Sequence, residues 1–299
     1  IGETVFDIIF RDRDPVAARA GGSMLNTAVS LGRLGLPVSF ISEYATDRAG
    51  EITDDFLAEN AVGTGMVYRY REGKTAVSLA FLNDSNDASY TFHKSYPAQR
   101  LRIALPDLSR EDLVLFGAFY SLMPEVRPQL MQFVKAARNA GAGILYDPNI
   151  RSPHKDAIHA LRELVYENIS LAGIVRGSDE DFRTICDISD GTAAYKLIRL
   201  HGCDTLVYTK SNTGVEIYTP GGMMELPVPE VKTLSTIGAG DSFNAGLLYG
   251  IFNTGKRVEE LSPGELSGIV KTAIAFGSHV CTQYDNYISR SFAEKILSM

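Results

Sequence analysis

The chain has 299 residues, 45% of them hydrophobic and 22% charged, which is the balance of an ordinary globular protein with a sizeable core. Its net charge of −7 disfavours nucleic acid and anionic membrane surfaces as partners, so we expect neither. No stretch approaches the ~20 consecutive apolar residues of a membrane span, and no secretory signal opens the sequence. Ile1 already lies in a strand-like run, so we expect a few further residues ahead of it.

Cysteine and histidine usage gives no sign of disulfides or of a transition metal. Cys186, Cys203 and Cys281 are odd in number and form no CxxC pair, so we interpret them as small core residues of a protein in a reducing compartment. The five histidines are scattered, without an HExxH motif or a Cys/His cluster. The sequence therefore predicts a cytoplasmic protein.

Strand-like and helix-like runs alternate along most of the chain. Strands are expected at residues 36–42, 112–117, 143–147, 171–177 and 204–209. Helical stretches separate them, including residues 47–60 and a helix from Pro124 to near Gly141. Such helices between strands are typical of βαβ units, so the sequence predicts an α/β fold with a mostly parallel sheet and helices on both faces. No linker or repeat divides the chain, and we expect a single domain over residues 1–299.

Residues 66–94 break this alternation. They show period-two patterning, turn residues at REGK and NDSND, and no helical stretch. This pattern predicts a small antiparallel excursion from the α/β domain. A flap of this kind could cover a site and exclude water from it, as lids do.

The stretch STIGAGDSFNAGLLYG (235–250) places Gly238, Ala239 and Gly240 ahead of Asp241, at the start of an apolar helix. Glycines let the backbone turn so that successive N–H groups point outward, and the helix N-terminus adds partial positive charge. Together these features predict an anion site. The alternative is that Asp241 only caps the helix, because Asp is a favoured N-cap residue.

The stretch AGGSMLNTAVSLGRLG (20–35) has paired glycines before a second helix, whose apolar side carries Leu25 and Val29. Gly21 and Gly22 would let a small polar ligand approach the backbone closely. Asn26 lies one turn later and could hydrogen-bond hydroxyl groups of that ligand. In the alternative interpretation this is an ordinary loop-to-helix junction and Asn26 faces solvent.

The stretch YDPNIRS (146–152) closes a predicted strand and places Asp147, Asn149 and Arg151 at alternating positions. In an open α/β sheet, residues just beyond the carboxyl ends of the strands face the ligand crevice. Arg151 could bind an anionic group there through two hydrogen bonds. The alternative is a simple turn, since Asp, Pro and Asn are all common turn residues.

The stretch RGSDEDF (176–182) follows the next predicted strand. Ser178 is a suitable N-cap, and the acidic residues behind it favour the first turn of a helix. A carboxylate at this place could instead hold water and Mg²⁺ beside a polyphosphate. Both interpretations stay open at this point.

These four stretches together resemble the ribokinase-like (PfkB-type) family of carbohydrate kinases, in the family's order and over nearly the whole chain, from Gly2 to about Cys281. GGSMLNTAVSLGRLG is similar to the family's amino-terminal signature, and STIGAGDSFNAGLL to its carboxy-terminal one. DPNIR and the opening GE…D are most similar to the fructokinase and 2-keto-3-deoxygluconate kinase branches. The resemblance implies a three-layer α/β sandwich with a β-lid. GxxxxGK[ST] and GxGxxG are both absent from the sequence, so neither a P-loop enzyme nor a dinucleotide-binding enzyme is expected.

The resemblance also implies catalytic and sugar-binding roles. Asp241 would be the general base that takes the proton from the sugar hydroxyl. The amides of Gly238, Ala239 and Gly240 would form the anion hole for the γ-phosphoryl group. The residues that would bind the sugar are Asp7, Gly21, Gly22, Asn26 and Arg151, the last of them at its far end.

The implied cofactors are ATP and Mg²⁺, with a monovalent cation such as K⁺ as a further candidate. Ser178 and Asp181 stand where the family usually has the Asn and Glu of a motif linked to Mg²⁺ and phosphate, so Asp181 is the candidate metal residue. TKSNTG (209–214) stands where the family has a Thr-x-Gly-x-x-Gly nucleotide loop. The residues that would contact the nucleotide are Ser178, Asp181, Thr209, Ser211, Gly214 and Gly240.

We therefore expect an ATP-dependent kinase that phosphorylates a hydroxyl group of a small sugar, fructose above others, and that can form a homodimer through its lid. One alternative is 2-keto-3-deoxygluconate kinase, in which Arg151 would meet a carboxylate, and another is a different PfkB-type sugar or nucleoside kinase. A third is a non-catalytic sensor of sugar or nucleotide. It is suggested by departures from the family pattern at Ser178, Asp181, Ser211, Ser235 and residues 281–290.

Overall fold

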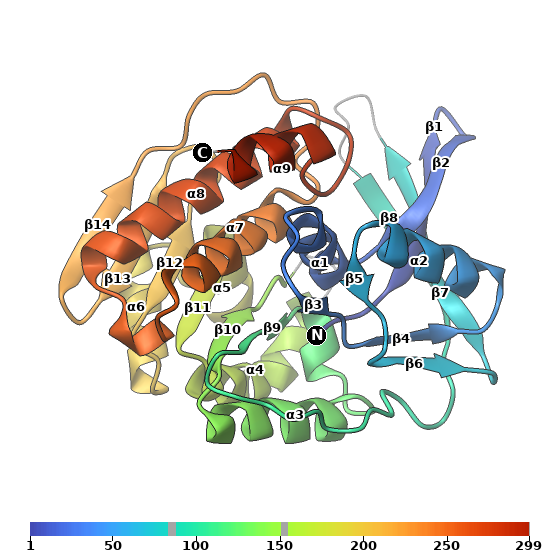
Figure 1. Cartoon of the computed structure of the whole chain (residues 1–299), viewed down its shortest axis with the longest axis horizontal. Coiled ribbons are helices and arrows are strands. Elements are labelled where there is room, and N and C mark those ends of the chain that lie inside the picture. Colours follow the sequence, from blue (N-terminus) through green and yellow to red (C-terminus); the bar gives the residue numbers. More distant parts are fainter. Residues whose placement is uncertain (83–87, 151–154, 299) are drawn as a thin grey trace. The chain divides into compact units, whose positions relative to one another are not determined.

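Residues 1–82, 88–150 and 155–298 are described by the computed structural model shown in Figure 1. The chain divides into two compact units. Unit 1 consists of Ile1–Ala104, Lys232–Ala245 and His279–Met299, and unit 2 of Leu105–Val231 and Gly246–Ser278. The expectation of one kinase domain over residues 1–299 stays a prediction.

Unit 2 is built on a six-stranded sheet in the order β14-β13-β12-β11-β10-β9. The four parallel strands are β9 (Leu113–Gly117), β10 (Gly143–Asp147), β11 (Ile174–Ser178) and β12 (Leu206–Thr209). Two antiparallel strands, β13 (Val215–Thr219) and β14 (Gly222–Leu226), complete one edge. Strands β10 and β12 are buried along their whole length, which is why their sequences are nearly continuous apolar runs. The predicted parallel sheet is confirmed.

Helices connect and cover these strands. The crossovers contain α3 (Arg127–Ala140), α4 (Lys155–Leu171), α5 (Asp179–Cys186) and α6 (Gly191–Leu200), and each of them contacts at least one strand of the sheet. Two 3₁₀ turns, η1 (Phe119–Leu122) and η3 (Val258–Glu260), add to the connections. The longer helices α7 (Ala239–Thr254) and α8 (Pro263–Cys281) lie side by side in Figure 1, and a Cβ at Gly246 would be 2.6 Å from the Cα of Ala273. The helix predicted from Pro124 begins three residues later, at Arg127.

Unit 1 contains a four-stranded sheet in the order β2-β1-β7-β8. Its strands are β1 (Val5–Arg11), β2 (Asp14–Gly21), β7 (Lys74–Leu82) and β8 (Ala88–Ser95). The outer pairs β1–β2 and β7–β8 are antiparallel, and β1 and β7 run parallel in the middle. The pair β7–β8 confirms the antiparallel part of the excursion predicted at 66–94 as part of the small lid sheet. Residues 67–70 lie outside this sheet, which instead includes β1 and β2, a hairpin that the sequence did not reveal.

The remainder of unit 1 consists of helices and short strand pairs. The helices are α1 (Ser23–Arg33), α2 (Arg48–Glu59) and α9 (Arg290–Leu297). The pairs are β3 (Val38–Ser39) with β5 (Val62–Gly63), and β4 (Ser42–Ala45) with β6 (Val67–Tyr70). The predicted helix 47–60 is confirmed as α2, whose N-cap Asp47 accepts a hydrogen bond from the amide of Gly50.

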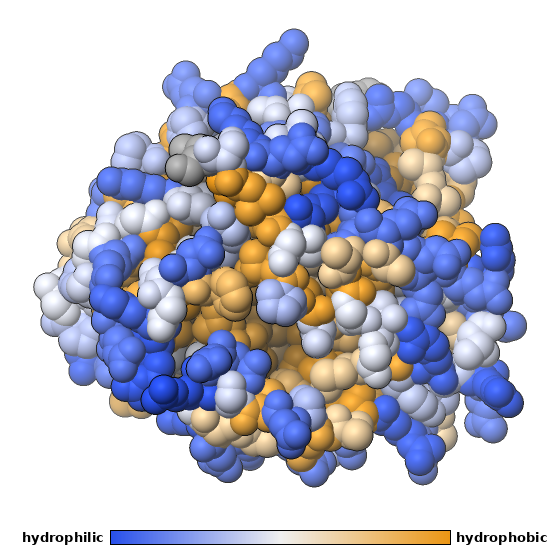
Figure 2. Space-filling view, in the orientation of Figure 1, coloured by the Kyte–Doolittle hydropathy of each residue, from blue (hydrophilic) through white to orange (hydrophobic). Residues whose placement is uncertain are grey.

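None of the helices described in the structure is long and apolar enough to cross a membrane. On the face shown in Figure 2, hydrophilic residues predominate around the rim of the view, while hydrophobic residues gather in its middle.

Candidate active site

The glycine turn, which we define as Gly238–Gly240 at the start of α7, is shaped by close packing within unit 1. Gly238 has φ +80°, a conformation that other residues rarely adopt. A Cβ at this position would also overlap the carbonyl oxygen of Asn286 and lie 2.6 Å from its carbonyl carbon. Helix α7 begins at the next residue, Ala239, and the first amides of a helix have no acceptor within the helix. The amide of Ala239 is 3.3 Å from the carbonyl oxygen of Thr236, a weak bond that a better acceptor could replace.

Asp241 is the third residue of α7, within its first turn, so it is not the N-cap residue of this helix. Its side chain is 4% exposed, and its Oδ2 accepts a hydrogen bond of 2.8 Å from Nδ2 of Asn26. The hydroxyl of Thr27 donates to the backbone oxygen of Asp241 at 2.9 Å. Two bonds from α1 therefore fix the start of α7 and the direction of this carboxylate.

Asn26 is buried, with 4% of its surface exposed, so the alternative in which it faces solvent is wrong. While Nδ2 binds Asp241, the side-chain oxygen Oδ1 is buried without a hydrogen-bond partner in the described part of the chain. A buried acceptor of this kind costs about 1–3 kcal/mol unless a donor reaches it. A ligand hydroxyl could supply that donor beside the Asp241 carboxylate.

Asp7 and the paired glycines belong to the hairpin β1–β2 and its exit. A Cβ at Gly21 would overlap a carboxylate oxygen of Asp7, so this glycine makes room for that side chain. Gly22 has φ +125°, and a Cβ there would overlap the carbonyl oxygen of Glu3. Both glycines are thus required by packing, and close approach of a ligand is an additional reason for them.

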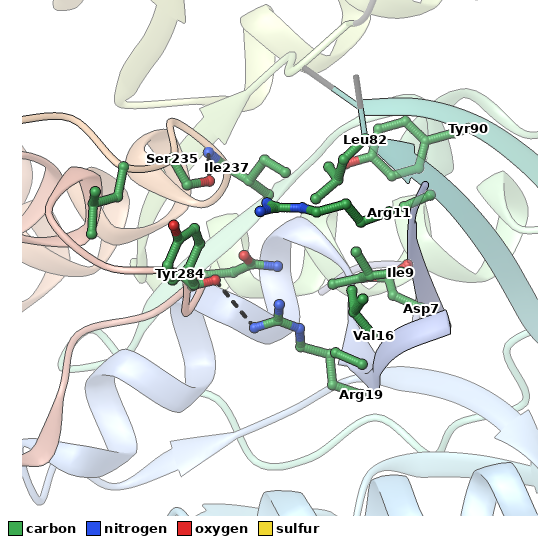
Figure 3. Close-up of a pocket in the computed structure, with 14 residues that line it drawn as sticks. Asp7, Ile9, Arg11, Val16, Arg19, Leu82, Tyr90, Ser235, Ile237 and Tyr284 are labelled. Atoms are coloured by element: carbon green, nitrogen blue, oxygen red, sulfur yellow. Dashed lines mark hydrogen bonds between the residues drawn. The ribbon is translucent and has the colours of Figure 1, made fainter. Parts of the chain in front are cut away.

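A pocket of about 350 Å³ lies within unit 1, a volume suited to a small ligand. Figure 3 shows Asp7, Ile9 and Arg11 of β1 on one side of it, with Ser235 and Ile237 opposite. Arg11 extends across the pocket toward Ile237. Half of the fourteen lining residues are aliphatic, and the polar groups come from Asp7, Arg11, Arg19, Tyr90, Ser235, Tyr284 and Asn286.

In unit 2 a buried network joins the carboxyl ends of three neighbouring strands. Arg176 on β11 donates from Nη1 to the carboxylate of Asp147, at the end of β10, at 3.1 Å. Its Nη2 donates to the hydroxyl of Thr209, at the end of β12, at 3.0 Å. Arg176 therefore fixes the starts of two loops that the sequence assigned to ligands. It was missed because one arginine in a strand-like run gives no signal.

Asp181 is 3% exposed and is held by hydrogen bonds from the protein itself. Its Oδ1 accepts from the amide of Ile150 at 2.7 Å, and its Oδ2 accepts from the amide and the hydroxyl of Ser178 at 2.7 and 2.6 Å. Burial, helped by the nearby charge of Asp147, raises the pKa of Asp181 to about 6. Ser178 is the N-cap of α5, as one interpretation of RGSDEDF expected, and forms a capping box with Asp181.

The predicted nucleotide loop is the connection between β12 and β13. The amide of Lys210 donates to the carbonyl of Gly214 at 2.9 Å, and the amide of Thr213 donates back to the carbonyl of Lys210 at 2.9 Å. Ser211 has φ +50° and Gly214 has φ +146°. The positive φ at Ser211 explains why a glycine would be favoured at this position of the loop.

The structure thus groups the predicted residues by unit. Unit 1 holds the glycine turn, Asp241, Asp7, the paired glycines and Asn26, while unit 2 holds Ser178, Asp181 and the loop 209–214. Arg151 lies outside the described residues. Sequence reasoning missed Arg11 and Arg19, which line the pocket. Arg11 begins the charged run RDRD, which suggests a solvent-facing turn, and Arg19 is a single charge between alanines, which gives no signal. No group of three or more His, Cys, Asp or Glu suited to a metal occurs among the residues that the structure describes.

Comparison with known proteins defines the class. The profile of the pfkB family carbohydrate kinases matches residues 1–291. The chain belongs to this family, whose members are ATP-dependent phosphotransferases. A fructokinase of Rhizobium leguminosarum bv. trifolii is 30% identical over 254 residues, which cover 83% of this chain and 77% of the relative. An aminoimidazole riboside kinase of Salmonella typhimurium is 25% identical over 251 residues, which cover 83% and 79%.

Solved structures of two similar proteins share the fold. The aminoimidazole riboside kinase from Salmonella enterica superposes with a TM-score of 0.85 at 22% identity, covering 100% of this chain and 98% of that one. A fructokinase from Vibrio cholerae O395, with fructose, ADP and calcium bound, superposes with a TM-score of 0.85 at 20% identity, covering 99% and 97%. The chain thus has the ribokinase-like α/β fold, with a mostly parallel sheet and a small antiparallel lid.

Proposed function

We propose that this chain transfers the γ-phosphoryl group of ATP to a hydroxyl group of a small sugar, with fructose as the preferred acceptor. The observation that carries the proposal is the pairing of Asn26 with Asp241 at the start of α7. One amide side chain orients the carboxylate and leaves its own Oδ1 for a ligand hydroxyl. A carboxylate next to a bound alcohol can accept its proton as the oxygen attacks phosphorus.

The start of α7 supplies the electrostatic part of the reaction. Phosphoryl transfer needs positioning and charge stabilisation more than covalent help from the protein. We assign the amides of Gly238, Ala239 and Gly240 to the transferred group, because the helix N-terminus favours negative charge there. Asp7, Gly21, Gly22 and Arg151 are assigned to the sugar.

The nucleotide and metal assignments concern unit 2. Thr209, Ser211 and Gly214 would contact the nucleotide, together with Ser178 and with Gly240 of the turn. Mg²⁺ binds chiefly through phosphate oxygens and water in such enzymes. Because both oxygens of Asp181 already accept hydrogen bonds, we propose that Asp181 acts on Mg²⁺ through a bound water. A K⁺ ion, a homodimer through the lid, a single kinase domain and a cytoplasmic location remain part of the proposal.

Fructose is favoured by the DPNIR motif and by the fructokinases among the relatives, including the one at 30% identity. A second acceptor, a riboside with a planar heterocycle, is favoured by the pocket. Its walls include Ile9, Ala80, Leu82 and Ile237, with the ring of Tyr90. Aliphatic and aromatic walls suit an apolar ring better than they suit hydroxyl groups.

The test is ADP release from ATP over a panel of fructose, ribose, 2-keto-3-deoxygluconate, adenosine and aminoimidazole riboside. We expect kcat/KM for fructose to exceed that for each other acceptor by at least about tenfold, which needs only ~1.4 kcal/mol of differential transition-state binding. A riboside with the highest kcat/KM would replace fructose as the substrate. Binding of a sugar without ADP release from any acceptor would favour a sensor and overturn the kinase proposal.

A further inference from the structure

The segment that follows α8 braces the glycine turn. We call residues 281–287 the bracing loop. The carbonyl of Cys281, at its beginning, accepts a hydrogen bond of 2.8 Å from the amide of Leu234. Near its end, the backbone of Asn286 occupies the space that a Cβ of Gly238 would need. The bracing loop therefore contacts both ends of the run 234–238, and its position sets the geometry of the turn.

The two ends of the bracing loop are each held by other contacts. Tyr287 lies under the guanidinium of Arg33 on α1, which is 4.5 Å from the ring centre. The amide of the following residue, Ile288, donates to the hydroxyl of Ser30 at 3.3 Å. At the other end the chain emerges from α8, which ends at Cys281. Within the loop, Nε2 of Gln283 donates to the carbonyl of Tyr287 at 2.5 Å, which closes the loop on itself without joining its middle to another element.

Arg19 of β2 joins the middle of the loop to another element. Its Nη1 donates to the carbonyl of Tyr284 at 3.2 Å and to Oδ1 of Asp285 at 3.2 Å, and Figure 3 shows Arg19 reaching Tyr284. The side chain of Arg19 is 20% exposed and that of Asp285 is 54% exposed. An ion pair this open to solvent contributes little to folding stability, since exposed pairs are worth about 0–1 kcal/mol. The contact is therefore better suited to placing the loop than to holding the fold.

We propose that Arg19 is a positioning residue for phosphoryl transfer. It holds Tyr284 and Asp285, which keeps Asn286 against Gly238 and so fixes the amides at the start of α7. Arg19 lies on β2, a strand of the lid sheet that also lines the pocket. Its hydrogen bonds to the bracing loop therefore connect this strand to the turn that would bind the phosphoryl group. This proposal rests on the proposed function of that turn.

The kinetic test compares Arg19→Ala, Arg19→Lys and Arg48→Ala with the parent enzyme. We expect Arg19→Ala to lower kcat about tenfold or more and to leave the sugar KM within about twofold, because misplacement by ~1 Å can cost on the order of a hundredfold. Arg19→Lys should recover most of the rate, since a single nitrogen of Arg19 makes both contacts and an ammonium can replace it. Arg48→Ala, which removes an exposed pair with Glu51, should change nothing.

A second measurement does not depend on activity. Hydrogen exchange of the amides in residues 234–241 should be faster in Arg19→Ala than in the parent protein, and unchanged in Arg48→Ala. If Arg19→Ala does not fold, Arg19→Gln gives the same comparison.

Two results would overturn the proposal. A raised sugar KM with an unchanged kcat would make Arg19 a sugar contact, and unchanged exchange at 234–241 would show that Arg19 does not hold the turn. A parent protein without kinase activity would contradict the proposed function instead, and the exchange measurement would still judge the bracing role.

Discussion

Asp241 is a buried carboxylate whose partners come from a helix more than two hundred residues earlier in the chain. Asn26 donates to its side chain and Thr27 to its backbone, so its direction is fixed before any substrate arrives. A carboxylate that is already oriented loses little conformational entropy on reaching the transition state. This is why a positioned general base accelerates proton transfer. The same contacts make an isosteric substitution structurally mild.

Asp241→Asn should therefore separate chemistry from folding. The side-chain oxygen of the new amide can still accept from Asn26, so the melting temperature should stay within a few degrees of the parent value. The amide cannot take the hydroxyl proton, and kcat should fall by about 10²–10⁴-fold. Steady-state ADP release and calorimetry measure the two quantities.

Asp204→Asn is the matched control. Asp204 forms an exposed pair with Arg199, and its substitution should leave both kcat and stability unchanged. Activity of Asp241→Asn near the parent level would show that the carboxylate is not the base.

At the level of elements, α9 is attached to the end of α8 through a neutral histidine. The amide of Ser289 donates to Nε2 of His279 at 3.4 Å, and the ring stacks on Phe292 with centroids 4.1 Å apart. Ser289 is the N-cap of α9. The hydroxyl of Ser289 also lies 3.0 Å from Nε2. A neutral ring with its proton on Nδ1 can accept hydrogen bonds at Nε2 from both the amide and the hydroxyl of Ser289. Burial lowers the pKa of His279, in agreement with this arrangement.

The sign of the resulting pH dependence follows from linkage. Because the folded state holds the His279 proton more weakly than the unfolded state, its contribution to stability is present above pH ~6.5 and is lost as pH falls through the lower folded pKa. His279→Phe keeps the stacking but leaves the Ser289 donor unpaired, which should cost about 1 kcal/mol at pH 7.5. The difference from the parent should shrink as the pH is lowered toward 5.

Chemical unfolding of both proteins between pH 5 and 7.5 checks this. Asp181 acts in the opposite direction, because its raised pKa makes the folded state bind a proton more tightly than the unfolded state, so its contribution grows as pH falls through about 6. It is common to both proteins and cancels in their difference. Parallel pH profiles of parent and variant would contradict the role given to His279.

The elements that could be predicted from the sequence were those marked by a local pattern, such as an apolar run or a helix-capping residue. The strand predicted at 143–147 matches β10 residue for residue, and α2 follows a capping aspartate. The hairpin β1–β2 gave no comparable signal, because its turn is a charged run and β1 pairs in parallel with a strand far along the chain, Phe6 lying opposite Val77 of β7. The bond between Asn26 and Asp241 spans 215 residues, and no local pattern encodes it. Only the resemblance to a kinase family placed those two residues in one site.

At the scale of the whole molecule, neither of the two units is a single continuous stretch of sequence. The chain crosses between units at residues 104/105, 231/232, 245/246 and 278/279, and the last two crossings fall inside α7 and α8. A helix is a cooperative ladder of hydrogen bonds, so melting one unit must fray the helices that continue into the other. Neither unit is therefore a segment that could fold separately.

We therefore expect a single unfolding transition for the whole chain. Leu25→Ala in α1 of unit 1 and Leu130→Ala in α3 of unit 2 each remove a fully buried side chain and should cost about 2–5 kcal/mol. Each should shift the entire transition to lower temperature, with equal calorimetric and van't Hoff enthalpies. Leu200→Ala, at an exposed position of α6, is the matched control and should leave the transition where it is. A second, earlier transition in either core variant would mean that the two units unfold independently and that α7 and α8 do not couple them.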